Sequence, residues 1–149
     1  MKRILIMLLL AITATANAQF SKMLGLWNTF DDKTGDMRSC VQITEKDGTY
    51  HGVIVAVYEK DAQGNFSIMK APYPKEYEGV VGTEIFIEMK EHKGHLKGKV
   101  YDPESKKTYF GKVTYEAKSD ELVLRGSLDK AGLLGRSQTW KRNLQHNIP

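Results

Sequence analysis

Residues 108–128, TYFGKVTYEAKSDELVLRGSL, decide the fold because apolar and polar side chains alternate through them twice. Residues 121–128 repeat the alternation of 108–117 after the short polar stretch Lys118–Asp120. Alternation with a period of two is typical of a strand that has one buried face. The stretch therefore predicts a β-hairpin whose buried face carries Tyr109, Gly111, Val113, Tyr115, Leu122, Leu124, Gly126 and Leu128.

Three glycines interrupt the apolar faces near the middle of their strands. Gly111 and Gly126 lie in this hairpin, and Gly98 has the same kind of position in residues 95–102, HLKGKVYD. A glycine inside a strand costs about 0.5–1 kcal/mol relative to alanine. A sheet that coils tightly on itself offsets this cost, because small residues relieve the crowding of inward side chains. The glycines therefore predict a closed barrel.

The same alternation extends over most of the chain, and turns such as 46–48 and 92–94 separate the alternating segments. The segment 60–81 contains two prolines and is expected to be a loop or a short edge strand. The predicted fold is all-β, an antiparallel up-and-down β-barrel of about eight strands. Strands are expected at 25–30, 39–45, 49–59, 82–91, 95–102, 108–117, 121–128 and 136–142. In 82–91 the alternation assigns to the buried face Ile85, Ile87 and Met89.

Residues 1–18 have the composition of a secretory signal. Lys2 and Arg3 precede an apolar run, and residues 16–18 have the small-x-small pattern that signal peptidase accepts. The run of about a dozen residues is too short to cross about 30 Å of hydrocarbon. We expect a signal peptide over 1–18, a cut after Ala18, and a single β-barrel domain over 19–149 that is periplasmic or secreted.

The distribution of charge argues against two classes of protein. The formal net charge of +4 falls by two when Lys2 and Arg3 are removed. Lysine and acidic residues interleave through 84–121, which is typical of a solvated face. The sequence has no basic block of the kind that binds nucleic acid, and no further segment apolar enough to span a bilayer. We therefore expect neither a nucleic-acid partner nor a membrane-spanning protein.

Candidate catalytic and metal-ligating residues are sparse. His92 and His95 flank a turn, which favours exposed turn residues over a metal site. The acidic stretch 31–36 lacks the spacing and the final glutamate of a calcium loop. The single cysteine, Cys40, lies in an alternating strand, which favours a buried apolar role over a redox site. The sequence predicts a protein that is not an enzyme and that uses no cofactor or metal.

Five motifs, spaced in order over residues 25–142, resemble an uncharacterised family of exported bacterial proteins, domain of unknown function 2147 (DUF2147). They are GLWNTFDDKTG at 25–35, EKDGTYHGVIV at 45–55, DPESKKTY at 102–109, LRGSL at 124–128 and GRSQTW at 135–140. The resemblance implies a lipocalin-like (calycin) barrel and brings no established activity, cofactor or catalytic residue. Two features depart from the family pattern: Lys106 replaces a turn glycine, and the cysteine pair that some relatives have in 60–81 is absent.

The resemblance also implies how the barrel is closed at one end. In lipocalin-like barrels a Gly-x-Trp near the first strand places an indole across one end, and a cation from the last strand packs over it. Residues 25–27 match the Gly-x-Trp element. Arg136 is the preferred cation and Arg142 the alternative, with a cation–π contribution of about 0.5–2 kcal/mol. The other interpretation is that Trp27 and Trp140 are simply large core residues.

Two binding hypotheses follow from the predicted barrel, which either fills its interior with side chains or encloses one small ligand. In the first hypothesis a small apolar or amphipathic ligand lies inside the barrel and is contacted by Arg125, Tyr58, Tyr101 and Tyr109. This role for Arg125 requires an inward side chain, whereas strict alternation points it outward. In the second hypothesis the barrel is packed, and an envelope interaction or stress protein binds its partner through loops, with Tyr73 and Tyr77 as candidate contacts.

Overall fold

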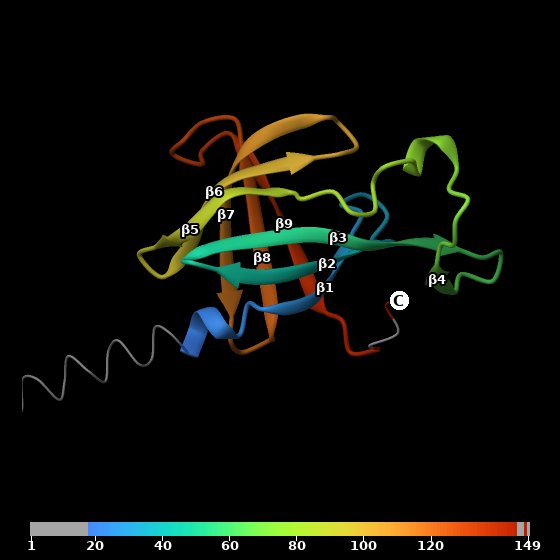
Figure 1. Ribbon diagram of the computed structural model, residues 1–149, viewed down its shortest axis with the longest axis horizontal. Coiled ribbons are helices and arrows are strands. Elements are labelled where there is room, and N and C mark those ends of the chain that lie inside the picture. Colours follow the sequence, from blue (N-terminus) through green and yellow to red (C-terminus); the bar gives the residue numbers. More distant parts are fainter. Residues whose placement is uncertain (1–17, 146–147, 149) are drawn as a thin grey trace, which may run out of the picture.

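The computed structural model describes residues 18–145 and residue 148. Residues 1–17 of the expected signal peptide lie outside the described residues. The regular structure of the described chain is almost all β-strand, and its helical parts are a turn at 18–21 and a short 3-10 helix (Figure 1). None of its helices is long and apolar enough to cross a membrane. The elements are β1 (Gly25–Phe30), β2 (Met37–Lys46), β3 (Thr49–Lys60), β4 (Phe66–Ile68), the 3-10 helix η1 (Lys75–Tyr77), β5 (Phe86–His92), β6 (His95–Asp102), β7 (Lys107–Glu116), β8 (Glu121–Ser127) and β9 (Gly135–Arg142).

Eight of these strands, all except β4, form a closed antiparallel barrel. Strand β3 pairs with β5, and β2 pairs with both β3 and β1. Strands β5 to β9 pair in sequence order, and β9 returns to pair with β1. The last pairing joins the two ends of the sequence, with Trp27 opposite Arg142 and Asn28 opposite Lys141. The predicted up-and-down barrel is confirmed. Strand β4 pairs with the last residues of β3 and extends that hairpin away from the barrel (Figure 1).

The strand order gives the barrel two distinct ends. At one end, which we call the clasp end, lie the helical turn at 18–21 and the β2–β3, β5–β6 and β7–β8 turns. At the other end, which we call the loop end, lie the β1–β2 turn, the segment 61–85, the β6–β7 turn and the β8–β9 loop. The β8–β9 loop projects from the barrel in Figure 1, where it is drawn in orange-red.

Side chains fill the barrel interior. Trp27 and Trp140 are buried, and the ring of Phe86 stacks on Trp140 with centroids 6.2 Å apart. Phe20 and Met23, which precede β1, are also buried and cover the clasp end. The interior is therefore a packed core. Its other buried apolar members are Val41, Ile43, Tyr50, Ile54, Val57, Met69, Ile85, Met89, Leu96, Val100, Val113, Leu122 and Leu124.

Strand β5 departs from strict alternation. Its register against β6 shifts between Ile87 and Lys90, and Glu88 adopts a φ of 51°. Such a bulge adds one residue to the strand and turns the following side chains to the opposite face. Before the bulge Phe86 is buried and Ile87 is exposed, and after it Met89 is buried, although an unbroken alternation cannot place Phe86 and Met89 on one face. The prediction that Ile87 lies on the buried face is wrong for this reason.

The mid-strand glycines have different amounts of room. A Cβ at Gly98 would lie 2.7 Å from two carbonyl oxygens of the β5 bulge, and a Cβ at Gly111 would overlap the side chain of Val100. A Cβ at Gly126 would only touch Tyr109, at 3.7 Å. Two of the three glycines therefore allow the close contacts that a tightly coiled wall requires, as expected for a barrel.

The segment 61–81 forms the lobe at the right of Figure 1. Apart from β4 and η1 it is irregular, as its prolines predict. Tyr73 and Tyr77 are only partly exposed, because both pack against the core together with Val80 and Val81. Tyr73 and Tyr77 therefore contribute to the packing of the core as well as to the surface of the loop.

Candidate functional site

The clasp end is built around Trp27. This residue is fully buried, and its indole Nε1 donates a hydrogen bond of 2.8 Å to the carbonyl oxygen of Met23. The guanidinium carbon of Arg142 lies 4.2 Å from the centre of the indole. Because Arg142 ends β9 and Trp27 belongs to β1, this contact fastens the last strand to the first.

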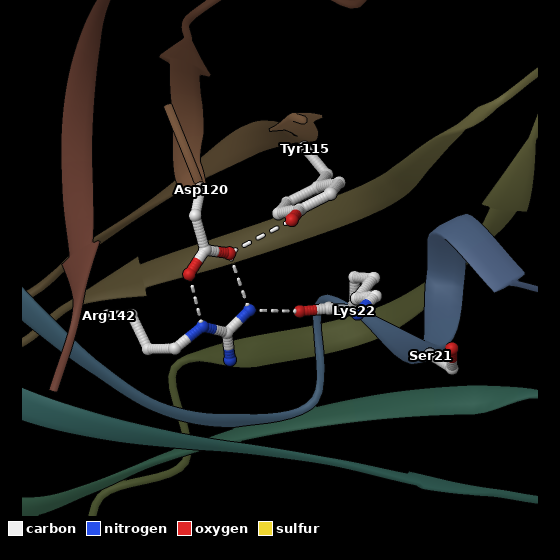
Figure 2. A pocket seen from close by; sticks show the side chains of 5 residues that line it. All are labelled: Ser21, Lys22, Tyr115, Asp120 and Arg142. Carbon is white, nitrogen blue, oxygen red and sulfur yellow. Dashed lines mark hydrogen bonds and ion pairs between the residues drawn. The ribbon is translucent and has the colours of Figure 1, made fainter. Parts of the chain in front are cut away.

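Arg142 is itself held by Asp120 and by the backbone of Lys22, as Figure 2 shows. Its Nε and Nη2 donate to the two carboxylate oxygens of Asp120 at 2.7 and 2.8 Å, and Nη2 also donates to the carbonyl oxygen of Lys22 at 2.7 Å. The hydroxyl of Tyr115 donates to Asp120 at 2.9 Å. The Arg142 hydrogen bonds are the main cause that holds the pKa of Asp120 below its ordinary value.

A surface pocket of about 280 Å³ lies beside this ion pair, lined by Ser21, Lys22, Tyr115, Asp120 and Arg142. The charges of Asp120 and Arg142, two of the residues that line it, already neutralise each other. Bidentate arginine–carboxylate pairs are strong and geometrically specific, so the pair favours a structural role over capture of a charged ligand. We call this arrangement the clasp.

Arg136, the preferred cation for packing over Trp27, does not lie there. Its side chain is 75% exposed and lies 3.4 Å from a carboxylate oxygen of Asp32 in the β1–β2 turn. The prediction for Arg136 is therefore wrong, because Arg136 stands at the loop end of β9 whereas Trp27 is near the clasp end. The alternative cation, Arg142, makes the contact. Trp140 is an interior residue, stacked on Phe86 rather than on a cation.

Arg125 points outward, as strict alternation indicates. Its Nε donates to the carbonyl oxygen of Gly132 at 2.6 Å, and Nη2 donates to that of Leu133 at 3.3 Å. Nη1 reaches the hydroxyl of Ser137 at 3.4 Å. Arg125 therefore supports the β8–β9 loop from outside the barrel, and the inward position proposed for a ligand contact is wrong.

The three tyrosines proposed as ligand contacts are dispersed. The register places Tyr101 and its partner Thr108 on the outer face, and Tyr109 on the inner face beside Gly126. The hydroxyl of Tyr58 donates to the amide oxygen of Asn28 at 2.9 Å, and burial raises the pKa of Tyr58 to about 12. The structure therefore does not bring these side chains together around one cavity.

Cys40 is buried beside Tyr58. The amide nitrogen of Asn143 donates to the Tyr58 hydroxyl at 3.2 Å and lies 3.5 Å from the Cys40 sulfur. Burial raises the pKa of the Cys40 thiol, which disfavours the reactive thiolate. This arrangement fits the predicted apolar role of Cys40. Within residues 18–145 and at 148, no three His, Cys, Asp or Glu side chains are grouped to hold a metal ion.

The outer face of the barrel carries a row of cations that crosses four adjacent strands. Lys90 of β5 pairs with Lys97 of β6, Lys97 with Lys112 of β7, and Lys112 with Arg125 of β8. Directly opposite residues on one face have Cβ atoms about 4.5–5.5 Å apart, and like charges there are destabilising. Besides burial, the charges of Lys112 and Lys97 lower the pKa of nearby His95. We call these four residues the cationic row.

At the end of this row, residues 128–134 present three leucines to solvent; we call this segment the leucine loop. Leu128, Leu133 and Leu134 are 72%, 80% and 67% exposed. The prediction that Leu128 lies on the buried face is wrong, because β8 ends at Ser127 and the chain turns outward. Arg125 belongs to the row and also bonds the leucine loop, so the two features are contiguous.

A second surface pocket, of about 200 Å³, lies beside the leucine loop, on three of the strands that carry the row. Its lining includes Lys99 of β6, Phe110 of β7 and Leu128 of the leucine loop. Lys99 and Phe110 are register partners on the outer face. The row, this pocket and the leucine loop form one amphipathic surface, which we call the docking face. Sequence reasoning missed it, because only the strand register aligns lysines that are scattered along the chain.

Comparison with known proteins agrees with this architecture. The family model described as "Uncharacterized protein conserved in bacteria (DUF2147)" matches residues 25–142. Comparison with curated protein sequences gave no match. Among solved structures, protein HP1028 from Helicobacter pylori, described as belonging to the lipocalin family, is similar, with 24% identity, a TM-score of 0.54, and coverage of 84% of this chain and 85% of that one. The fold is thus lipocalin-like, and the chain belongs to the DUF2147 family.

Proposed function

We propose that the protein is an exported, non-catalytic binding protein whose packed barrel is a scaffold and whose binding surface is the docking face. The observation that carries this proposal is the exposure of Leu133 and Leu134 in a loop that is fixed by internal hydrogen bonds. Exposed apolar side chains that gather on a fixed surface are typical of interaction sites.

A small ligand inside the barrel, which the lipocalin-like fold allows, has less support. The interior is occupied by Trp27, Phe86 and Trp140 together with their buried neighbours. Ligand pockets are typically about 300–1,000 Å³ and largely preformed. Opening such a volume here would require displacing buried aromatic side chains, whereas the docking face is already accessible.

In-cell photo-crosslinking tests the proposal. A diazirine amino acid replaces Leu133 in one variant and Lys46, an exposed residue at the clasp end, in the control variant. We expect adducts from position 133 in living cells well above those from position 46. Equal labelling at the two positions would contradict the proposal, whatever the chemical nature of the adduct.

Export is tested separately. The expected cut after Ala18 predicts that protein recovered from the cell envelope or the medium begins at Gln19. Intact-mass spectrometry of the recovered chain identifies that end. A chain retained in the cytoplasm with Met1 in place would contradict this part of the proposal.

A further inference from the structure

We infer that the docking face binds an anionic lipid surface, with the leucine loop inserted among the acyl chains and the cationic row on the headgroup phosphates. This inference rests on the proposed function, because it names what covers the docking face. Three observations support it: the internal pairing of the loop backbone, the small size of the apolar tip, and the alignment of the lysines.

The backbone of residues 132–134, which we call the tip of the leucine loop, is hydrogen-bonded within the protein. The N–H groups of Gly132, Leu133 and Leu134 donate to the backbone carbonyl or the carboxylate of Asp129, at 3.1, 3.0 and 2.6 Å. The carbonyls of Gly132 and Leu133 accept from Arg125, and that of Leu134 accepts from the N–H of Leu128. The hydrocarbon of a bilayer contains no water that could hydrogen-bond an unpaired N–H or C=O group. Backbone that enters lipid must therefore be paired within the protein. All six groups of these three residues meet that condition.

The size and composition of the tip favour lipid over a protein partner. Stable protein interfaces bury about 800 Å² on each partner, contributed by about 20–30 residues. Their central contacts are enriched in tryptophan, tyrosine and arginine, and leucine is under-represented. The leucine loop offers three leucines on a narrow projection. This surface is small for a protein partner but suits insertion into an interfacial layer, where affinity grows with each buried apolar side chain.

The lysines of the cationic row supply the complementary charge. Lys90 and Lys97 are exposed and Lys112 is partly exposed, and their strand positions are directly opposite one another. Anionic headgroups would relieve the mutual repulsion of these lysines, and basic residues near a membrane surface are attracted to acidic lipids. The acid within the leucine loop, Asp129, is already bonded to the loop amides. The docking face carries the four positive charges of the cationic row.

Vesicle flotation with the purified mature chain tests the inference. The vesicles are phosphatidylcholine alone, or phosphatidylcholine and phosphatidylglycerol in a two-to-one ratio. We expect binding to the anionic vesicles that falls in about 1 M salt, where charge interactions are screened within about 3 Å. Binding to neutral vesicles should be at least about tenfold weaker, because only the leucines contribute there.

Two double variants separate the two parts of the docking face. Leu133→Ser with Leu134→Ser should lower partitioning onto anionic vesicles by about tenfold or more, because exposed apolar area is lost. Lys97→Gln with Lys112→Gln should lower it several-fold and remove most of the salt dependence. Leu144→Ser is the matched control, since Leu144 is 75% exposed outside the leucine loop. Thermal unfolding verifies that each variant is folded.

The outcomes distinguish the inference from the proposed function. Absence of vesicle binding by the folded wild-type chain would overturn the lipid inference, and so would equal binding by wild type and both double variants. If position 133 still forms adducts in cells but only with protein, the proposed function stands and the lipid inference fails. If position 133 forms no specific adduct, the proposed function itself fails.

Discussion

The guanidinium of Arg142 lies on the indole of Trp27, with its central carbon 4.2 Å from the ring centre. The two residues are register partners in the pairing of β9 with β1. That pairing is short, because only two residue pairs join the strands, whereas β8 and β9 share seven. The side-chain contact therefore reinforces one of the two shortest strand pairings of the barrel, the other being that of β3 with β5.

Replacing Arg142 by alanine should lower the free energy of unfolding by about 1.5–3 kcal/mol, because the cation–π contact and the hydrogen bonds to Asp120 are lost together. Chemical denaturation measures the change. Arg136→Ala is the matched control, since its exposed ion pair with Asp32 should contribute less than about 1 kcal/mol. Equal losses in the two variants would show that the clasp does not stabilise the barrel.

The contribution of the clasp should depend on pH. The pKa of Asp120 is held below its ordinary value of 3.8, first by the hydrogen bonds from Arg142. A lowered folded-state pKa means that the folded protein binds fewer protons than the unfolded chain. The stabilisation is therefore fully present above pH 3.8 and is lost as the pH falls through the folded-state pKa.

Asp120→Asn isolates this contribution, because asparagine tolerates the φ of 51° at this position. The difference in melting temperature between wild type and variant should be constant near neutral pH and shrink below about pH 4. Asp31, Asp61 and Asp129 also have lowered pKa values and remain in both proteins, so only the difference is informative. A difference that does not change down to acid pH would contradict the role of Asp120.

Gly98→Ala should destabilise the barrel by about 1–3 kcal/mol, because the added methyl group meets two backbone carbonyl oxygens at 2.7 Å. Gly126→Ala is the control, since its Cβ would lie at an ordinary contact distance of 3.7 Å from Tyr109. We expect that variant to unfold within about 0.5 kcal/mol of wild type or to be slightly more stable. Urea denaturation compares the two. Similar losses would mean that strand propensity, rather than the contact with the β5 bulge, requires the glycine.

Lys106→Gly should stabilise the protein by about 0.5–1 kcal/mol. Lys106 has a φ of 57°, in the left-handed region that costs a residue with a Cβ about 1–2 kcal/mol. Glycine removes that strain. It also raises the conformational entropy of the unfolded chain, which lowers the stability of the folded protein by about 0.5–1 kcal/mol. The turn thus keeps the conformation that favours glycine, although the sequence has lysine. A lower melting temperature in the variant would contradict this interpretation.

Alternation predicted most of the inward residues of β6 and β7, because a period of two assigns each side chain to one face. It failed where the backbone breaks the period. The β5 bulge buries Phe86 instead of Ile87, and the end of β8 leaves Leu128 in solvent. A bulge depends on packing against neighbouring strands, as at Gly98, and a single strand contains no signal for it.

The candidate site was less predictable than the fold. Trp27 was correctly expected to meet a cation of the last strand, but choosing between Arg136 and Arg142 required the register of β9 against β1. The leucine loop could not be predicted from the sequence for a related reason. Leu133 and Leu134 are apolar residues next to a strand, and only the hydrogen bonds that their loop donates to Asp129 and accepts from Arg125 fix them in solvent.

The sequence by itself determined the barrel, because alternating side chains separated by tight turns leave an antiparallel sheet few other ways to bury one face. The tertiary structure decided which charges become neighbours. Lys90, Lys97 and Lys112 are interleaved with acidic residues along the chain, yet strand pairing places them in one row. Register depends on bulges, turns and cross-strand packing, all of which act between segments that are distant in sequence.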